Sequence, residues 1–396
     1  MPNVNQLDVV DVRNILNSLH TQATGQQTLA PTNTGEFVSM ATTTLAVGTD
    51  IVHNALMTTI AKTIFSARPY DMKFRGLVAD DTRWGGIVRK ITHADNDISE
   101  DDKVYHNIVD GKRNADMYKV KKGDVLEMRF YGSDVYQDYF TTFEDQLYTA
   151  FQSEAQLGSF IASKTTEMNN KWTQYMEELA RGSLANFIGA KVSLDNGVVH
   201  LLTEYNAFTG RTGTDVLSAT DIYKPENVKP FFEWVKARIN TLSRRMTERS
   251  ELFQYKITGK KIMRHTPYAN QKIYLSADAL DIIDATVLSE AYHNSGLKYA
   301  DVEGVSYWQA IDTPNKISVA PSVVNETGAA SVGENVEVDN IFGVMFDEDA
   351  IAINPIRRSV GVTPMEQEGR YWNTWLSANT RYTNDLTEKG IILLLD

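Results

Sequence analysis

The stretch from Phe143 to Ala180, FEDQLYTAFQSEAQLGSFIASKTTEMNNKWTQYMEELA, decides the fold because it contains no proline and a single glycine, Gly158. Its apolar side chains recur at steps of three and four residues, which is the period of one helix face. These apolar positions are Leu147, Phe151, Leu157, Ile161, Met168, Trp172, Tyr175 and Leu179. A helix of ~38 residues would be about 57 Å long, whereas an average globular helix has about 11–12 residues. So long a helix belongs to a coiled coil, to a bundle, or to a flat and extended subunit.

The composition is that of a globular protein with a sizeable core, since 42% of the 396 residues are hydrophobic and 23% are charged. No cysteine is present, which excludes disulfides, thiolate zinc sites and cysteine nucleophiles. The net charge of −12 argues against general binding of nucleic acid through a basic surface. No apolar run approaches the ~20 residues of a membrane span, and the first residues lack the pattern of a secretory signal.

The first 68 residues contain two helical patterns separated by a segment of low charge. Apolar residues between Val4 and Leu19 recur with helical spacing, and a second such pattern covers Ile51–Phe65. Residues 20–50 are rich in Thr, Gly, Asn and Gln, and we expect them to form an extended arm without a core of its own. The second helix should end before Pro69, because the residue before a proline is pushed out of the helical conformation.

A charged projection is expected between Trp84 and Tyr136. Alternating patterns that begin near Ile87 and Val125 predict two strands. The residues between them carry acidic side chains first and basic ones later: Asp95, Asp97, Glu100, Asp101 and Asp102, then Lys112, Arg113, Lys119, Lys121 and Lys122. A loop of about 30 residues inside a compact domain is unusual, so a long projecting hairpin is favoured over a variable surface loop.

Separated runs of helices and strands after residue 180 indicate the α+β class. Gly182 and Gly189 are expected to mark the end of the long helix. Residues 224–249 predict another helix with a proline near its start, and the chain ends in strands, the last of them Ile391–Leu395. We expect the apolar face of the long helix to pack on the sheet that contains this last strand.

No combination of residues forms a recognisable catalytic centre. The seven histidines lack metal-ligand spacing, no serine lies in a G-x-S-x-G turn, and no glycine-rich segment matches a phosphate-binding loop. We therefore expect no catalytic residue and no cofactor. The run Asp347-Glu348-Asp349 offers hard oxygen ligands for calcium or magnesium, but a charged loop between two strands is the favoured interpretation, so no metal site is predicted.

The order of an N-terminal arm, a charged hairpin and a long helix resembles that of the major capsid proteins of tailed bacteriophages, which have the Hong Kong 97 (HK97) shell fold. Similarity in the residues themselves is confined to about 265–396. It lies in four segments: Tyr268–Asp278, Phe346–Pro355, Gly369–Leu376 and Thr380–Asp396.

The resemblance implies an α+β, HK97-like fold in four parts. These are an N-terminal arm (1–68), an E-loop hairpin (84–136), a P domain built on a long spine helix (69–83 with 137–224 and 345–396) and an A domain (225–344). It assigns Phe151, Leu157, Ile161, Met168, Trp172 and Leu179 to the spine helix, with Gly158 as a flex point. It assigns contacts between subunits to Trp84, Asp101, Asp102, Lys112, Arg113, Lys121 and Lys122.

The function that the resemblance implies is structural rather than enzymatic. A major capsid protein self-assembles into hexamers and pentamers of an icosahedral shell around phage DNA, in the host cytoplasm, and becomes part of the virion. A portal protein and a decoration protein are further implied partners, with non-specific contact to the packaged double-stranded DNA and no membrane. Too few residues precede the helix expected at Ile51–Phe65 for a built-in scaffolding segment, so a separate scaffolding protein is expected. Lysines such as Lys90 are available for cross-links, but no acceptor asparagine is identified, and none is assumed.

Two alternatives remain at this point. A nanocompartment shell protein of the encapsulin type would share the same fold, and a metal-dependent enzyme or ligand-binding protein would use the acidic run at 347–349. The coiled coil is disfavoured, because Glu154 and Lys164 interrupt the apolar pattern and no sustained heptad follows. The long helix is therefore interpreted as the spine of a flat subunit, with its polar face toward solvent or packaged DNA.

Overall fold

The computed structural model describes residues 9–66, 74–78, 88–94, 108–109, 112–113, 125–130, 133–257, 261–287, 301–325 and 327–396. Its α-helices are α1 (Val9–Thr24), α2 (Thr34–Leu45), α3 (Thr49–Ser66), α4 (Glu144–Ala150), α5 (Glu154–Ser193), α6 (Leu201–Thr209), α7 (Pro225–Thr247) and α8 (Ala277–Val287). The strands of the hairpin and the N-terminal half are β1 (Val88–His93), β2 (Ile108–Val109), β3 (Lys112–Arg113), β4 (Val125–Phe130), β5 (Ser133–Phe143) and β6 (Val198–His200). The remaining strands are β7 (Gln271–Ser276), β8 (Asp301–Val305), β9 (Ile317–Val319), β10 (Ser322–Val324), β11 (Ala330–Val332), β12 (Val336–Val338), β13 (Ile341–Asp347), β14 (Ile351–Val362), β15 (Tyr371–Asn384) and β16 (Gly390–Leu394).

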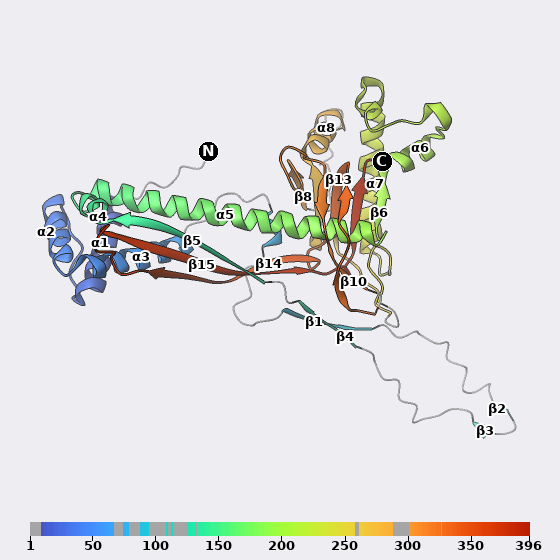
Figure 1. Ribbon diagram of the computed structural model, residues 1–396. Helices are drawn as coiled ribbons and strands as arrows, with labels where there is room; N and C mark the ends of the chain where they lie inside the picture. The colour runs from blue at the N-terminus through green and yellow to red at the C-terminus, as the bar shows by residue number, and fades with distance from the viewer. Residues whose placement is uncertain are drawn as a thin grey trace.

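The long helix α5 has 40 residues and runs the length of the elongated body (Figure 1). At 1.5 Å per residue it is about 60 Å long. The prediction of one helix from Phe143 was wrong, because the chain breaks between α4 and α5. Ser153 caps α5 there, its hydroxyl accepting a hydrogen bond from the amide of Gln156 at 3.3 Å. Phe151 is buried in this junction instead of lying in the spine helix.

The helix also continues past the two glycines that were expected to end it. Both Gly182 and Gly189 lie inside α5, since the surrounding helix-forming residues outweigh a cost of about 1 kcal/mol per glycine. Gly189 has a packing reason: a Cβ there would lie 2.5 Å from Cγ1 of Val319 in β9. The glycine therefore allows a strand to approach the helix closely.

Alanine at these two positions should have opposite effects on stability. At Gly182 a Cβ meets nothing within 4 Å, so Gly182→Ala should raise the free energy of unfolding by about 0.5–1 kcal/mol. Gly189→Ala should lower it by about 1–3 kcal/mol, because Val319 has to move. Urea unfolding of both variants measures the difference. Two changes of the same sign would contradict the packing described for Gly189.

A five-stranded sheet in the order β6-β16-β13-β7-β8 forms the centre of one end of the body. Its inner strands β13 and β16 are buried on both faces, which explains their almost continuous apolar sequence. Ile392 and Leu394 pack with the C-terminal half of α5, whereas Ile391 and Leu393 pack with α7 on the opposite face. The expected packing of the long helix on the sheet of the last strand is thus present for that half of α5.

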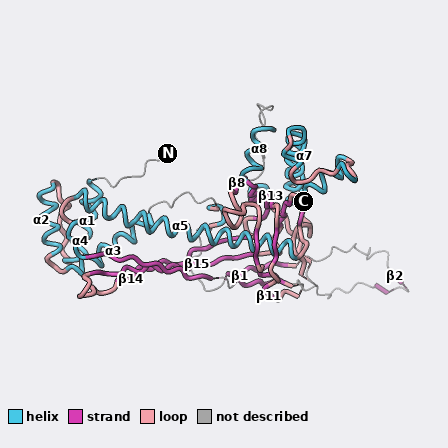
Figure 2. The backbone as a smooth tube through the Cα atoms, turned by 45° about the horizontal axis from the view of Figure 1, so that its top comes forward, coloured by secondary structure: helices cyan, strands magenta, loops and turns pink. Residues whose placement is uncertain are grey.

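The other half of α5 lies along a three-stranded antiparallel sheet in the order β14-β15-β5 (Figure 2). Its buried residues Leu157, Ile161 and Met168 share a separate core with Trp372 of β15 and with the N-terminal helices. Two apolar cores therefore follow one another along the same helix. No helix within the described parts of the chain is long and apolar enough to cross a bilayer.

The N-terminal helices α1, α2 and α3 gather at the end of α5 where α4 lies (Figure 1). The prediction of an extended segment at 20–50 was wrong, because residues 34–45 form α2. Phe37, Ala41 and Thr44 are its buried residues, at helical spacing, and the Asn33 side chain caps its first turn. Most other residues of this segment are exposed, but Phe37 and Ala41 join the core that the N-terminal helices share with α5.

Candidate functional site

The stem of the projecting hairpin has two different faces. Strands β1 and β4 pair antiparallel from Val88↔Phe130 to His93↔Val125, which confirms the two predicted strands and their pairing. Because side chains alternate in a strand, one set is half-buried and the other is exposed. The half-buried side chains are Lys90, Thr92, Leu126, Met128 and Phe130.

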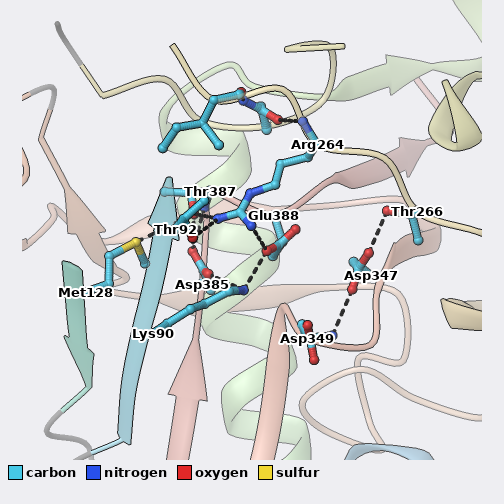
Figure 3. Close-up of polar contacts among 12 residues, drawn as sticks. Lys90, Thr92, Met128, Arg264, Thr266, Asp347, Asp349, Asp385, Thr387 and Glu388 are labelled. Carbon is cyan, nitrogen blue, oxygen red and sulfur yellow. Dashed lines mark hydrogen bonds and ion pairs between the residues drawn. The ribbon is translucent and has the colours of Figure 1, made fainter. Parts of the chain in front are cut away.

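Lys90 anchors the half-buried face to the body through an ionic clamp (Figure 3). Its Nζ lies 2.9 Å from Oδ2 of Asp385 and 2.5 Å from Oε1 of Glu388, both buried in the connection between β15 and β16. Burial opposes the charge of Lys90, but the two carboxylates outweigh it and raise the pKa of Lys90 above its ordinary value. The clamp therefore joins residues almost 300 positions apart in the chain.

Arg264 completes the clamp from the segment before β7. Its Nη1 lies 2.8 Å from Oε1 of Glu388, so Glu388 is shared between two cations. Its Nη2 donates to Oγ1 of Thr92 at 3.2 Å, which is a second link from the body to β1 (Figure 3). The hydroxyl of Thr387 lies 3.6 Å from Sδ of Met128 and so touches β4 as well. Both strands of the stem are thus held against the body.

The connection that carries the acidic residues is itself rigidly held. The amide and the hydroxyl of Thr387 both donate to Oδ1 of Asp385, at 2.9 and 2.7 Å. Lys389 is also buried, and its Nζ donates to the carbonyl oxygen of Glu248 at 2.7 Å and to Oγ of Ser250 at 3.0 Å. Burial lowers the pKa of Lys389 to about 8. The position of the stem thus depends on the segment that follows α7.

Lys191 brings the spine helix into the same region. It is fully buried, and its Nζ donates to Oδ1 of Asn196 and to the carbonyl oxygen of Phe253, each at 2.9 Å. The carbonyl oxygen of Leu386 lies at 3.4 Å. Burial lowers the pKa of Lys191 to about 7, even though Asp385 and Glu388 oppose this shift. Helix α5, the segment after α7 and the β15–β16 connection therefore meet around one amine.

The acidic run at 347–349 is engaged in hydrogen bonds rather than gathered around a common point. Oδ2 of Asp347 accepts from Oγ1 of Thr266 at 2.7 Å, and its Oδ1 accepts from the amide of Asp349 at 3.0 Å (Figure 3). Oε1 of Glu348 accepts from the side chain of Asn270. Within the described ranges, no group of three or more acidic or histidine side chains could hold a metal ion. The run therefore acts as a turn between β13 and β14.

Most of the residues to which the resemblance assigns contacts between subunits lie outside the described residues. Trp84, Asp101, Asp102, Lys121 and Lys122 lie outside the described residues. Lys112 and Arg113 form β3, which pairs with β2 through Ile108↔Arg113 and Val109↔Lys112.

The residues assigned to the spine helix, apart from Phe151, pack in the two cores that follow one another along α5. Leu157, Ile161 and Met168 are buried, and Trp172 and Leu179 are half-buried beside the other core. At Gly158 a Cβ would lie 3.1 Å from Cγ2 of Val12 in α1, so this glycine permits close packing of α1 on α5. Its role as a flex point stays a prediction.

Sequence reasoning missed the clamp itself. Lys90 was noted only as an available lysine, and Arg264, Asp385 and Glu388 were not identified. The one available signal was the charged run Asp385-Leu-Thr-Glu-Lys389 between two strongly apolar strands. Charged residues in so short a connection are usually solvent-exposed, and nothing in the sequence shows that these become buried.

Comparison with known proteins identifies the family. The sequence model of the Phi29-like phage major capsid proteins matches residues 14–394. The chain belongs to this family. It is a structural protein of the virion whose copies assemble into the icosahedral shell of a phage head, as the resemblance implied. This decides against the nanocompartment, enzyme and ligand-binding alternatives. No curated protein matches the sequence.

Solved structures show the same fold at low sequence identity. A chain in the capsid structure of Staphylococcus phage Andhra aligns with a TM-score of 0.55 and 11% identity, over 83% of this chain and 86% of that chain. A chain in the structure of the head fiber and inner core protein gp22 of bacteriophage P68 aligns with a TM-score of 0.53 and 10% identity, over 83% and 85%. The predicted α+β, HK97-like capsid fold is therefore confirmed as a class.

Proposed function

We propose that copies of this capsid protein contact one another through the hairpin of one subunit and the outer face of the β14-β15-β5 sheet of the next. The observation that carries this proposal is a row of exposed apolar side chains on the edge strand β5. Val135, Tyr139 and Phe143 are all about half or more exposed, and the ring of Tyr139 stacks on Trp375 of β15 at 4.6 Å. Aromatic side chains in such a row are typical of protein interaction surfaces.

The outer face of the hairpin stem has the complementary character. Ile91 and Val125 are exposed apolar residues there. Beside them, Glu127 forms ion pairs with Arg89 at 2.8 Å and with Arg129 at 2.7 Å, which leaves one net positive charge. The acidic residues near the start of β5 lie on the opposite side of the strand, where Asp138 pairs with Lys171 of α5 at 2.8 Å, so the proposed contact between copies rests on apolar side chains.

The division into parts is proposed in a modified form. We retain residues 1–68 as the arm and 84–136 as the E-loop, and we assign α5 with the β14-β15-β5 sheet to the P domain. The five-stranded sheet pairs β6 and β16 with β7, β8 and β13, so strands from both ranges first assigned to the P and A domains lie in one sheet. We therefore assign this sheet, with α6, α7 and α8, to the A domain.

Partners other than the chain's own copies rest on the family resemblance alone. These are a separate scaffolding protein, a portal protein, a decoration protein and the packaged double-stranded DNA. Co-expression with the scaffolding protein of the same phage should give closed shells of uniform diameter. Equally uniform shells from the capsid protein alone would remove the need for that partner.

Single aspartates on the two surfaces should block assembly without unfolding the subunit. We expect Tyr139→Asp and Ile91→Asp to remain folded and to reduce shell yield at least tenfold, because each would bury a carboxylate in a contact between copies. Tyr139→Phe and Ile91→Val are the matched controls, since they keep the apolar surface. Sedimentation and negative-stain microscopy measure shells, and thermal unfolding verifies the fold. Shells of normal yield from both aspartate variants would overturn the proposed contact.

A further inference from the structure

His53 in α3 is a buried titratable group that has no part in the clamp or in the proposed contact surfaces. Its side chain is 0% exposed, and its ring stacks on Trp372 of β15 with 4.7 Å between centroids and 12° between planes. Neither Nδ1 nor Nε2 has a hydrogen-bond partner among the described residues. A buried polar atom without a partner is costly, so this arrangement calls for a physical explanation.

The surroundings of His53 connect the N-terminal helices to the sheet. Asp50, one turn earlier in α3, accepts hydrogen bonds from the indole Nε1 of Trp372 and from the amide of Met365, the latter at 3.2 Å. The charged groups that act on the imidazole are Asp50 on its own helix and Lys164 on α5. The carboxylate favours a charged imidazole but is already engaged by Trp372, and the ammonium disfavours it.

Stacking alone does not require a histidine. A phenyl ring would stack on Trp372 and fill the same space without two nitrogens that lack partners. Besides these nitrogens, an imidazole adds a charge that it acquires on acidification. That charge would appear inside the apolar core that α3 shares with α5 and β15.

We propose that His53 is an acid-sensitive latch that holds the N-terminal helices α1–α3 on the body at neutral pH and loosens them on acidification. In the docked state the imidazole is neutral. Protonation places a buried imidazolium in an apolar core near Lys164, and the one carboxylate that favours this charge, Asp50, is already engaged by Trp372. The docked state therefore loses stability relative to a state in which α3 has moved away and the ring is hydrated.

The direction of the pH effect follows from the pKa of the docked ring. Burial lowers the pKa of His53 from 6.5 to about 4. A histidine whose pKa is lowered in the docked state stabilises that state fully above about pH 6.5. This stabilisation is lost as the pH falls from 6.5 through 4. The equilibrium for local opening should therefore rise on the order of 100-fold between pH 7 and pH 4.

Hydrogen exchange of the folded subunit, corrected for the intrinsic effect of pH, tests the latch. We expect amides of α1–α3 to lose protection between pH 6.5 and 4 before those of β13 and β16. In His53→Phe the amides of α1–α3 should keep their protection to lower pH. His53→Leu is a second variant in case the His53→Phe subunit does not fold. His20→Asn is the control, because His20 is buried in the same cluster but bonded to Thr44 through Nδ1 at 2.8 Å.

Two results would overturn the proposal. One is a wild-type subunit in which the helices and the central sheet lose protection together. The other is the same acid opening in wild type and in His53→Phe, or its disappearance in His20→Asn instead. The test reads local opening within a subunit, so it is independent of the proposed contacts between copies.

Discussion

Lys90→Met is expected to release the hairpin stem from the body and to lower the free energy of unfolding by about 3 kcal/mol. Lys90 supplies the cation shared by Asp385 and Glu388, both of which are almost fully buried. Breaking a buried ion pair by removal of one partner costs roughly 3–5 kcal/mol. The lower end applies here, because Lys90 is partly exposed and Arg264 remains beside Glu388.

The loss should be local before it is global. Amides of β1 and β4 should exchange faster with solvent, while those of β13 keep their protection. Shells should become fewer or irregular, because a stem that is no longer attached to the body does not keep one orientation. Hydrogen exchange and negative-stain microscopy measure these two effects.

A matched control lies next to Lys90 in the same strand. Arg89 faces outward and forms an exposed pair with Glu127, so Arg89→Met should change the stability of the subunit by about 0–1 kcal/mol. A double-mutant cycle of Lys90→Met and Glu388→Gln should give a coupling energy above about 1 kcal/mol. Unchanged protection of the stem in Lys90→Met would refute the clamp.

Replacement of Lys191 by alanine should destabilise the subunit by about 4 kcal/mol. The change removes the donor to Oδ1 of Asn196, leaves the carbonyl oxygen of Phe253 with only the amide of Gly390, and creates a cavity beside α5. An unsatisfied buried acceptor costs roughly 1–3 kcal/mol, and a large-to-small core substitution costs roughly 2–5 kcal/mol. Lys191→Met fills more of the space and should lose less. Urea unfolding at pH 7.5 measures both, and a loss below about 1 kcal/mol for alanine would contradict this account.

The pH dependence of the free energy of unfolding separates the contribution of the Lys191 amine from that of the side chain's volume. Because the pKa of Lys191 is about 7 in the folded subunit and 10.5 unfolded, this group adds stability as the pH rises from about 7 to 10.5. Between pH 7.5 and 9.5 the wild type should gain about 2 kcal/mol relative to Lys191→Met. Lys171→Met is the control, because Lys171 is only partly buried and pairs with Asp138 at the protein surface, so its curve should parallel that of the wild type. Parallel curves for Lys191→Met and wild type would refute the shifted pKa.

Predictions from local pattern succeeded where one periodic signal dominated. The long helix, the stem strands and the final buried strand were all expected, because a run of apolar residues at one period specifies one element. The pattern failed where a neighbouring segment decided the outcome. Residues 34–45 form a helix because their few apolar side chains reach a core made mostly by other helices. Gly189 was read as a helix end because its contact with Val319 lies 130 residues away.

The candidate site shows the same division more sharply. The seven contact residues expected in the hairpin were chosen for their charge or size in a projecting segment, and most lie outside the described residues. The clamp uses other charged residues, Lys90, Arg264 and Glu388, which stand in three separate segments. No local sequence pattern distinguishes a lysine that forms a buried ion pair from a lysine that is exposed to solvent.

By itself, the sequence determined the class of the protein: a cysteine-free α+β chain built on one very long helix, with a charged hairpin before it and the layout of a capsid subunit. Only the tertiary structure decided where α5 begins and ends, which lysines are buried, and which acidic residues hold the hairpin. The physical reason is that helix and strand periods act over a few residues, whereas an ion pair or a stacked ring depends on distances between segments that the chain brings together only when it folds.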